Sequence, residues 1–229
     1  MSYTPSPAGF WKRYVAYFID IAILYVIVEI LSSLFFAFRG QSELGSLKEI
    51  LATLQAAQAS GETPDLLAIM QTLQAVILPA LIFSTVAYLV LAGIYFSVME
   101  SSPQQATLGK RLLGIKVTDI HGQRIGLPQS IARFFAASLS WITMNLGHAL
   151  AAWTPERRAL HDYLAATRVE NVDPQNPGMP LWGWAIIFLH ALAFIGACLL
   201  MVLMMWLMMR TTRICRNGGP RRCRIGSRS

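Results

Sequence analysis

The sequence contains few charged residues for its length. Of its 229 residues only 14% are charged, while 55% are hydrophobic. A soluble domain of this size carries roughly a quarter charged residues. The shortage argues against a soluble globular domain and indicates a chain that is largely surrounded by lipid, where each spanning helix uses about 20 residues.

Cysteine is scarce as well, and no spacing typical of metal ligands occurs. Cys198 lies in an apolar run, and Cys215 and Cys223 lie near the end of the sequence, without a CxxC pair. A disulfide framework is therefore not expected. Neither a Ser/His/Asp arrangement nor a pair of nearby carboxylates is evident. We expect no enzyme activity, no cofactor and no metal site.

Acidic residues are missing from the C-terminal tail, residues 210–229. This tail holds seven arginines, whereas the first 209 residues hold 12 basic and 12 acidic residues. The net charge of +7 thus comes from the tail alone and does not indicate binding to nucleic acid. A polybasic segment beside an apolar stretch is instead expected to contact anionic lipid headgroups.

Four long apolar stretches are present, at about residues 14–38, 76–99, 131–153 and 181–209. The sequence therefore predicts an all-α integral membrane protein with four transmembrane helices. The first stretch is too long for a cleavable signal peptide and is expected to remain in the protein. The third is weak because it is interrupted by charged and polar residues, so the alternative is a re-entrant or interfacial segment.

The polar segments between these stretches suggest further elements. Leucines and isoleucines recur at helical spacing early in residues 39–75, which predicts an amphipathic helix there. Thr63-Pro64-Asp65 resembles a helix start that leads into the second span, where Pro79 is a candidate kink. Alternation in residues 114–120, followed by His121-Gly122, indicates a short β-hairpin. No internal repeat is evident.

Lysines and arginines in short loops indicate the orientation, because cytoplasmic loops carry an excess of them. With four spans, residues 1–9, the basic loop 100–130 and the tail all lie in the cytoplasm. Three arginines, Arg157, Arg158 and Arg168, then lie outside. The alternative of a re-entrant third stretch keeps these three inside but places the tail outside. We expect both termini in the cytoplasm.

Asp20 is the sharpest feature of the sequence. It lies six residues past Tyr14, about 9 Å into the apolar layer, where a carboxylate normally faces a partner or water. Arg13 shares its helix face but is too distant along the axis for a relaxed pair. We therefore expect a cation from another segment, Lys110, Arg111 or Arg133, to pair with Asp20. The ion pair is either structural or part of a transport site.

Two further groups are secondary candidates. Glu29 lies nearly opposite Asp20 on the helix and either faces a cavity with His190 or His148 or extends outward. His161 and Asp162 are adjacent, but on a helix they point about 100° apart and would not bind one ion together. A pair between Asp162 and Arg158, four residues earlier, is the expected arrangement.

These residues fall into a recognisable order along the chain. The pattern is formed by Gly9-Phe10-Trp11, Arg13, Ala16 and Ile19-Asp20; Gln105-Ala106-Thr107, Gly109-Lys110, Gly114 and Lys116-Val117; Arg133; and Leu160-His161-Asp162, Ala165, Thr167 and Val169. It resembles the RDD family of membrane proteins, which is named for one arginine and two aspartates. The resemblance covers about residues 8–170.

The resemblance implies a bacterial multi-pass membrane protein in the inner membrane, with Arg13, Asp20 and Asp162 as the signature residues. It suggests an RDD-like domain over residues 10–170, followed by an additional span within 171–209. A small, homo-oligomeric ion or solute transporter is the expected function. The alternative is a membrane adaptor or assembly factor whose buried charges are structural.

Overall fold

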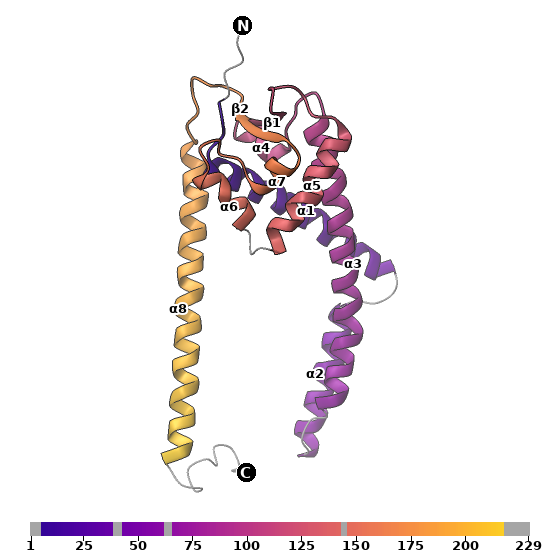
Figure 1. Cartoon of the computed structure of the whole chain (residues 1–229). Helices are drawn as coiled ribbons and strands as arrows, with labels where there is room; N and C mark the ends of the chain where they lie inside the picture. The colour runs from indigo at the N-terminus through magenta and orange to yellow at the C-terminus, as the bar shows by residue number, and fades with distance from the viewer. Residues whose placement is uncertain (1–5, 39–42, 62–65, 143–145, 218–229) are drawn as a thin grey trace. The chain divides into compact units, whose positions relative to one another are not determined.

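The structure is a computed structural model that describes residues 6–38, 43–61, 66–142 and 146–217. It divides into two units, residues 1–178 and 179–229, and each is described by itself. The first unit contains α1 (Phe10–Phe38), α2 (Glu43–Ser60), α3 (Leu66–Ser101), α4 (Leu108–Leu112), β1 (Ile115–Asp119), α5 (Leu127–Ile142), α6 (Leu146–Trp153), α7 (Leu160–Leu164) and β2 (Thr167–Asn171); the second contains α8 (Leu181–Asn217) (Figure 1).

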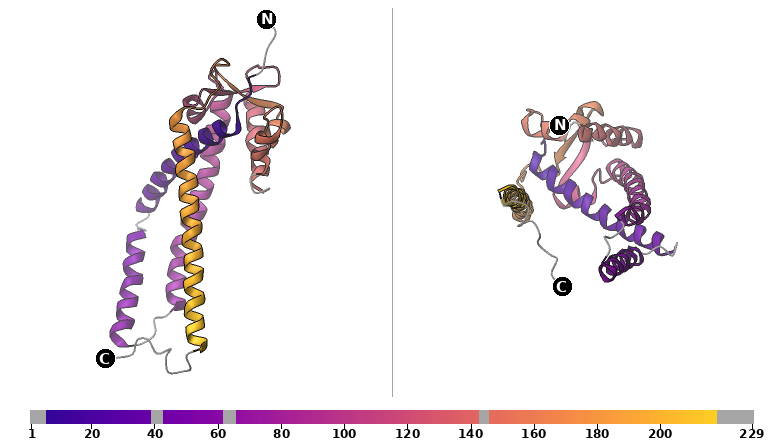
Figure 2. Two further views of the ribbon diagram at one scale, coloured as in Figure 1. Left: turned by 90° about the vertical axis from the view of Figure 1, so that its left-hand side faces the viewer. Right: turned by 90° about the horizontal axis from the view of Figure 1, so that it is seen from below.

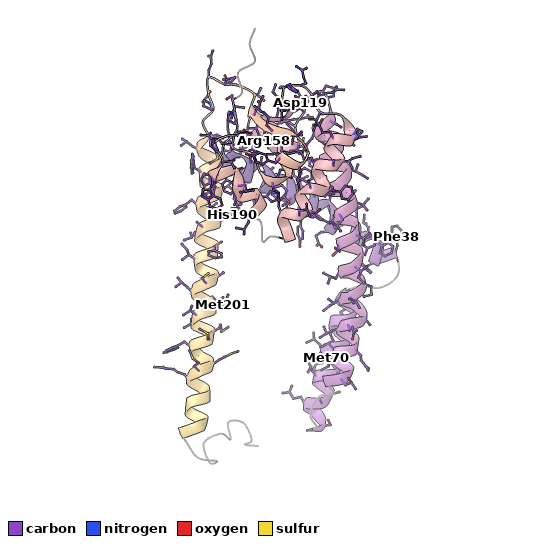
Figure 3. The ribbon with its side chains drawn as sticks, in the orientation of Figure 1. Phe38, Met70, Asp119, Arg158, His190 and Met201 are labelled. Carbon is purple, nitrogen blue, oxygen red and sulfur yellow. The ribbon has the colours of Figure 1, made fainter. Side chains whose placement is uncertain are left out.

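Three helices are long and apolar enough to cross a membrane. They are α1, the part of α3 from residue 69 to 101, and the part of α8 from residue 181 to 210. Most side chains on these helices are exposed, including large apolar ones, as expected for surfaces that face lipid (Figure 3). The chain is thus a predominantly helical membrane protein, as the sequence predicted.

A small mixed domain, which we call the cap, gathers at the end of the first unit where α1 begins and α3 ends (Figures 1 and 2). It consists of residues 102–126 and 154–178, with α4, β1, α7 and β2. The two strands pair antiparallel, with Val117 opposite Val169. Ile115, Val117, Val169 and Ile125 are buried at its centre.

The two strands correct the prediction of an all-α fold and of a hairpin after residue 114. The expected strand exists as β1, but its partner is β2, about fifty residues later in the chain. The N-terminal segment adds to the same sheet, because Ala8 N donates to Val169 O at 2.9 Å. Alternation in a single sequence shows a strand but does not show which segment pairs with it.

The predicted third span at 131–153 is not one crossing helix. Within the described residues it forms α5 and α6, which have 16 and 8 residues and pack against each other. A helix needs about 20 residues to cross the hydrocarbon layer. The polar segments on either side of this pair meet in the cap, since β1 precedes α5 and β2 follows α6. The prediction of four spans, with the 154–180 segment on the far side, is therefore wrong.

The remaining elements agree with the sequence in part. The predicted amphipathic helix is present as α2, with Leu51 and Leu54 exposed. Pro79 lies inside α3, which continues through it. The predicted helix start at Thr63-Pro64-Asp65 falls outside the described residues. In the second unit α8 continues to Asn217, and the rest of the arginine-rich tail also falls outside them.

Candidate functional site

Asp162 is the centre of a buried charge cluster where the cap meets α1, α3 and α5. Its side chain has no exposed surface, and it lies in the first turn of α7, where its Oδ2 accepts from Ala159 N at 3.0 Å. Arg13 Nη1 donates to the same Oδ2 at 2.5 Å, and Arg133 Nη2 donates to Oδ1 at 2.9 Å. A single carboxylate thus connects α7 with α1 and α5.

Arg13 reaches this carboxylate because it lies in the first turn of α1, directly after the segment that joins the sheet. Its guanidinium also donates to two backbone carbonyls, from Nε to Ala8 O at 3.1 Å and from Nη2 to Val169 O at 3.3 Å. Acceptors on three sides fix the planar guanidinium in one orientation. The pair between Arg13 and Asp162 consequently anchors the start of α1 to the cap.

Arg133 links Asp162 to a second buried acid, Glu100, at the end of α3. Arg133 Nη1 donates to Glu100 Oε2 at 2.5 Å, and Lys110 Nζ donates to Glu100 Oε1. The ion pairs therefore run from Lys110 through Glu100, Arg133 and Asp162 to Arg13, with alternating sign. This order satisfies each buried charge with at least one opposite charge, which burial requires.

Burial and charge act in opposite directions on the pKa values of this cluster. Burial favours the neutral form of Asp162, but Arg13 and Arg133 outweigh it and hold the pKa well below its usual range. Burial likewise disfavours charged Arg133, yet Glu100 and Asp162 raise its pKa. For Lys110 burial prevails over Glu100 and lowers the pKa.

Asp20 adjoins this cluster but has different partners. Its side chain is fully buried, and its carboxylate accepts from Thr107 Oγ1 at 2.5 Å, Tyr95 Oη at 2.7 Å and Gly109 N at 2.8 Å. No ion pair to Asp20 occurs among the described residues. The prediction that Lys110, Arg111 or Arg133 pairs directly with it is therefore wrong: hydroxyls and a backbone amide fill the positions that a cation would take.

A glycine makes this contact possible. A Cβ on Gly109 would lie 2.1 Å from Ala16 O and 3.0 Å from Asp20 Cγ. Since heavy atoms that are not bonded do not approach so closely, a side chain at residue 109 would push α4 away from α1. The contact between α1 and α4, and with it the environment of Asp20, depends on this position.

His161 extends the cluster towards α6. Its Nε2 lies 3.2 Å from Arg133 Nη2, and because a guanidinium can only donate, Nε2 is the acceptor and the neutral ring carries its proton on Nδ1. Burial, opposed by Asp162, lowers the pKa of His161 to about 3. The ring of His148 on α6 lies 5.0 Å away between centroids, and burial lowers its pKa too.

The structure brings most of the predicted site residues together. Arg13, Lys110, Arg133, His161 and Asp162 form one cluster, and Asp20 lies beside it. Glu29 is not part of it, because its side chain is exposed on α1.

Two predicted pairings change. Arg158 contacts the backbone carbonyl of Asp162, and the ion pair of Arg158 is with Glu156, so the expected pair of Arg158 and Asp162 is absent from the described residues. Arg13 and Asp162, which the four-span arrangement places on opposite sides of the membrane, are bonded directly.

Glu100 and the neutral partners of Asp20 were not predicted from the sequence. Glu100 carried a usable signal, because it is the only acid in the stretch from residue 69 to 101 and lies at its end. An acid at that position in a span is costly and calls for a partner. Tyr95 and Thr107 carried no comparable signal, since hydroxyl side chains are common in polar loops and apolar helices alike.

The sequence model of the RDD family matches residues 7–166, which include Arg13, Asp20, Arg133 and Asp162. The chain belongs to the RDD family. A relative in Bacillus subtilis (strain 168), called "Uncharacterized protein YxaI", is 33% identical over 167 residues, which make up 71% of this chain and 96% of the relative. No solved structure matches.

Proposed function

We propose that this RDD protein is a small ion or solute transporter in which Asp20 binds H⁺ or a cation. The observation that carries the proposal is the difference between three buried carboxylates. Glu100 and Asp162 are each bonded to two cationic side chains, whereas Asp20 is bonded to neutral donors only. Of these three carboxylates, Asp20 thus carries the charge that a transported ion could neutralise directly.

The neutral partners also suit a group that changes its charge. When Asp20 carries a proton, it becomes a donor, and a hydroxyl of Thr107 or Tyr95 can turn to accept from it. Both residues are therefore compatible with either state of the carboxylate. A lysine or arginine in their place would oppose protonation, because it can only donate.

We further propose the arrangement of the protein in the membrane. The α5–α6 pair re-enters the membrane from the side of the cap, and the cap with the N-terminus lies at the cytoplasmic surface of a bacterial inner membrane. The nine lysines and arginines at the first span and in the cap, against two in residues 39–75, support this orientation, whereas the seven arginines of the tail oppose it. Three crossings place the two ends on opposite sides, so the prediction of both ends in the cytoplasm is replaced by a C-terminal tail outside.

We also propose that the protein forms homo-oligomers, because one copy offers few helices from which to build a path. The arginines of the tail are expected to contact anionic lipid headgroups. We propose no enzymatic reaction, since the charges of the cluster are paired with one another.

The test is flux through purified protein in liposomes. Wild-type vesicles loaded with a pH-sensitive dye, and vesicles with Na⁺ or K⁺ gradients, are compared with vesicles that contain Asp20→Asn, which keeps the shape and removes the charge. The matched control is Glu29→Gln on the exposed side of the same helix. Flux in the wild type and the control, but not in folded Asp20→Asn, is expected. No flux in the wild type, or equal flux in Asp20→Asn, would contradict the proposal.

The second candidate function is that of a membrane adaptor or assembly factor. The observation that favours it is the continuous series of ion pairs from Lys110 to Arg13, which connects the cap with α1, α3 and α5. Under this function, Asp20→Asn lowers the stability of the protein, and the wild type shows no flux. The same liposome experiment, with thermal unfolding of each variant, separates the two candidates.

A further inference from the structure

Two segments of the chain have the same order of elements. Residues 102–128 run through a turn, a five-residue helix and a five-residue strand, and residues 154–180 do the same 52 positions later. α4 corresponds to α7 and β1 to β2 without an insertion or a deletion. Seven of the 27 aligned positions are identical: Pro103 and Pro155, Leu108 and Leu160, Leu112 and Leu164, Val117 and Val169, Gln123 and Gln175, Gly126 and Gly178, and Pro128 and Pro180.

The two segments also share uncommon backbone conformations at equivalent positions. Before each short helix a residue other than glycine has positive φ, 55° at Gln105 and 51° at its counterpart Arg157. After each helix a second left-handed residue follows, Gly114 at 61° and Ala166 at 51°. Alanine at such a φ is unfavourable by about 1 kcal/mol or more, so its occurrence at the position of a glycine indicates a conserved geometry within the chain.

Equivalent hydrogen bonds close both copies. Gln105 N donates to Ser102 O at 2.9 Å, and Arg157 N donates to Thr154 O at 3.0 Å. At the ends of the helices, Leu113 N donates to Gly109 O, and in the same way Ala165 N donates to His161 O. The local fold is thus repeated in detail, although most side chains differ.

The pairing of the strands defines the symmetry between the copies. Val117 is paired with Val169, which is also its counterpart in the alignment. Such an antiparallel ladder has a twofold axis that passes between these two residues, perpendicular to the sheet. This axis keeps both copies on the same face of the sheet. The helices that lead into the copies, α3 and α6, both end at the cap, at the equivalent residues Ser101 and Trp153 (Figure 1).

The short helices expose apolar side chains at equivalent positions. Leu112 on α4 is 62% exposed and Leu164 on α7 is 58% exposed. α4 also lies beside the apolar part of a spanning helix, since Asp20, ten residues into α1, bonds to Thr107 and Gly109. A helix seated there presents its free side to lipid.

We propose that residues 102–128 and 154–180 are two copies of one duplicated unit, related by a twofold axis along the membrane normal. We infer from this symmetry that Leu112 and Leu164 contact lipid at the same depth. Repeats related by such an axis occur in other transporters. The inference concerns the architecture of the cap and holds whether or not the protein transports an ion.

Site-directed spin labelling tests the proposal. Leu112→Cys and Leu164→Cys are labelled in a protein without Cys198, Cys215 and Cys223, in vesicles of phosphatidylcholine and phosphatidylglycerol. Collision with oxygen, compared with a water-soluble nickel chelate, gives the depth of each label. Both labels are expected to favour oxygen, at depths that agree within about one helical turn, 5 Å.

Equivalent positions in the cap provide the control. Labels at Gln123→Cys and Gln175→Cys, both exposed, are expected to favour the nickel chelate and to provide the reference for a position in water. A nickel-accessible label at either leucine position would overturn the proposal, as would two depths that differ by more than a turn. Because no flux is measured, these outcomes are independent of the proposed transport.

Discussion

Arg133 is the residue on which the buried cluster depends most. Its guanidinium meets both Glu100 and Asp162, which come from different helices and lie at opposite ends of the side chain's fork. Without Arg133, each of these two buried carboxylates loses one of its cationic partners. A buried charge without compensation destabilises a protein far more than the loss of an ion pair on the surface.

Arg133→Met is therefore expected to lower the free energy of unfolding by about 3–5 kcal/mol. Arg133→Lys keeps the charge but cannot contact both acids with a planar fork, so its loss is expected to be smaller. Thermal unfolding in detergent measures both. The control is Arg124→Met, an exposed arginine in the cap, which should leave the melting temperature almost unchanged. Equal melting temperatures for Arg133→Met and the control would contradict this account of the cluster.

His161 makes the stability of the protein depend on pH. Burial lowers its pKa to about 3 in the folded protein, while the unfolded chain has the ordinary value near 6.5. The unfolded state thus binds more protons below pH 6.5, and stability falls as the pH decreases from there towards 3, by up to about 1.4 kcal/mol per pH unit for one proton.

The melting temperature of the wild type is expected to fall between pH 7.5 and pH 5, a range above the pKa at which carboxylates ordinarily titrate. In His161→Gln this fall should be smaller, whereas His121→Gln, at an exposed position, should behave as the wild type. The same fall in His161→Gln and the wild type would show that another group causes it.

At the scale of residues, the sequence was sufficient to find isolated charges. Arg13, Asp20 and Asp162 stand out because a charge in or beside an apolar stretch is costly and needs a partner. The partners themselves could not be found. Asp20 meets Thr107 and Gly109 only because α4 packs against α1, and no feature of either segment alone indicates that contact.

The cap shows the same limit at the scale of elements. Alternation predicted β1, but β2 has the sequence Thr-Arg-Val-Glu-Asn, which is polar and has little alternation for a sequence-based assignment to detect. What identifies β2 is its pairing with β1. The internal repeat was missed for a related reason, since the two copies share a backbone while most of their side chains differ.

Cysteine pairs test the register of these strands. Lys116 lies opposite Glu170, and residues in that relation have Cβ atoms about 4.5–5.5 Å apart, which suits a disulfide better than the 7–8 Å of a diagonal pair. In a protein without its native cysteines, Lys116→Cys with Glu170→Cys is expected to cross-link faster under mild oxidation than Lys116→Cys with Arg168→Cys. A faster reaction of the diagonal pair would indicate a shifted register.

At the scale of the whole molecule, hydropathy predicted a membrane protein and the three long apolar helices. It also predicted a fourth span, at the third apolar stretch, that the structure does not contain as one helix. Residues 131–153 are apolar enough to suggest a crossing. They form two shorter helices because the segments before and after them must meet: β1 pairs with β2, and Arg133 near the middle of α5 bonds to Asp162 beyond α6. The hydropathy of a segment depends only on its own length and composition, so it does not reveal contacts with other segments.

One cap, on one side of the membrane, is built from the segments before α5 and after α6. Labelling of single cysteines in intact cells with a thiol reagent that does not cross the membrane tests it most directly. Gln123→Cys and Gln175→Cys, in the two halves of the cap, should give the same result, and Gln58→Cys on α2, between the first two spans, should give the opposite one. Labelling of Gln123→Cys and Gln175→Cys from opposite sides would restore a crossing between them and contradict the account.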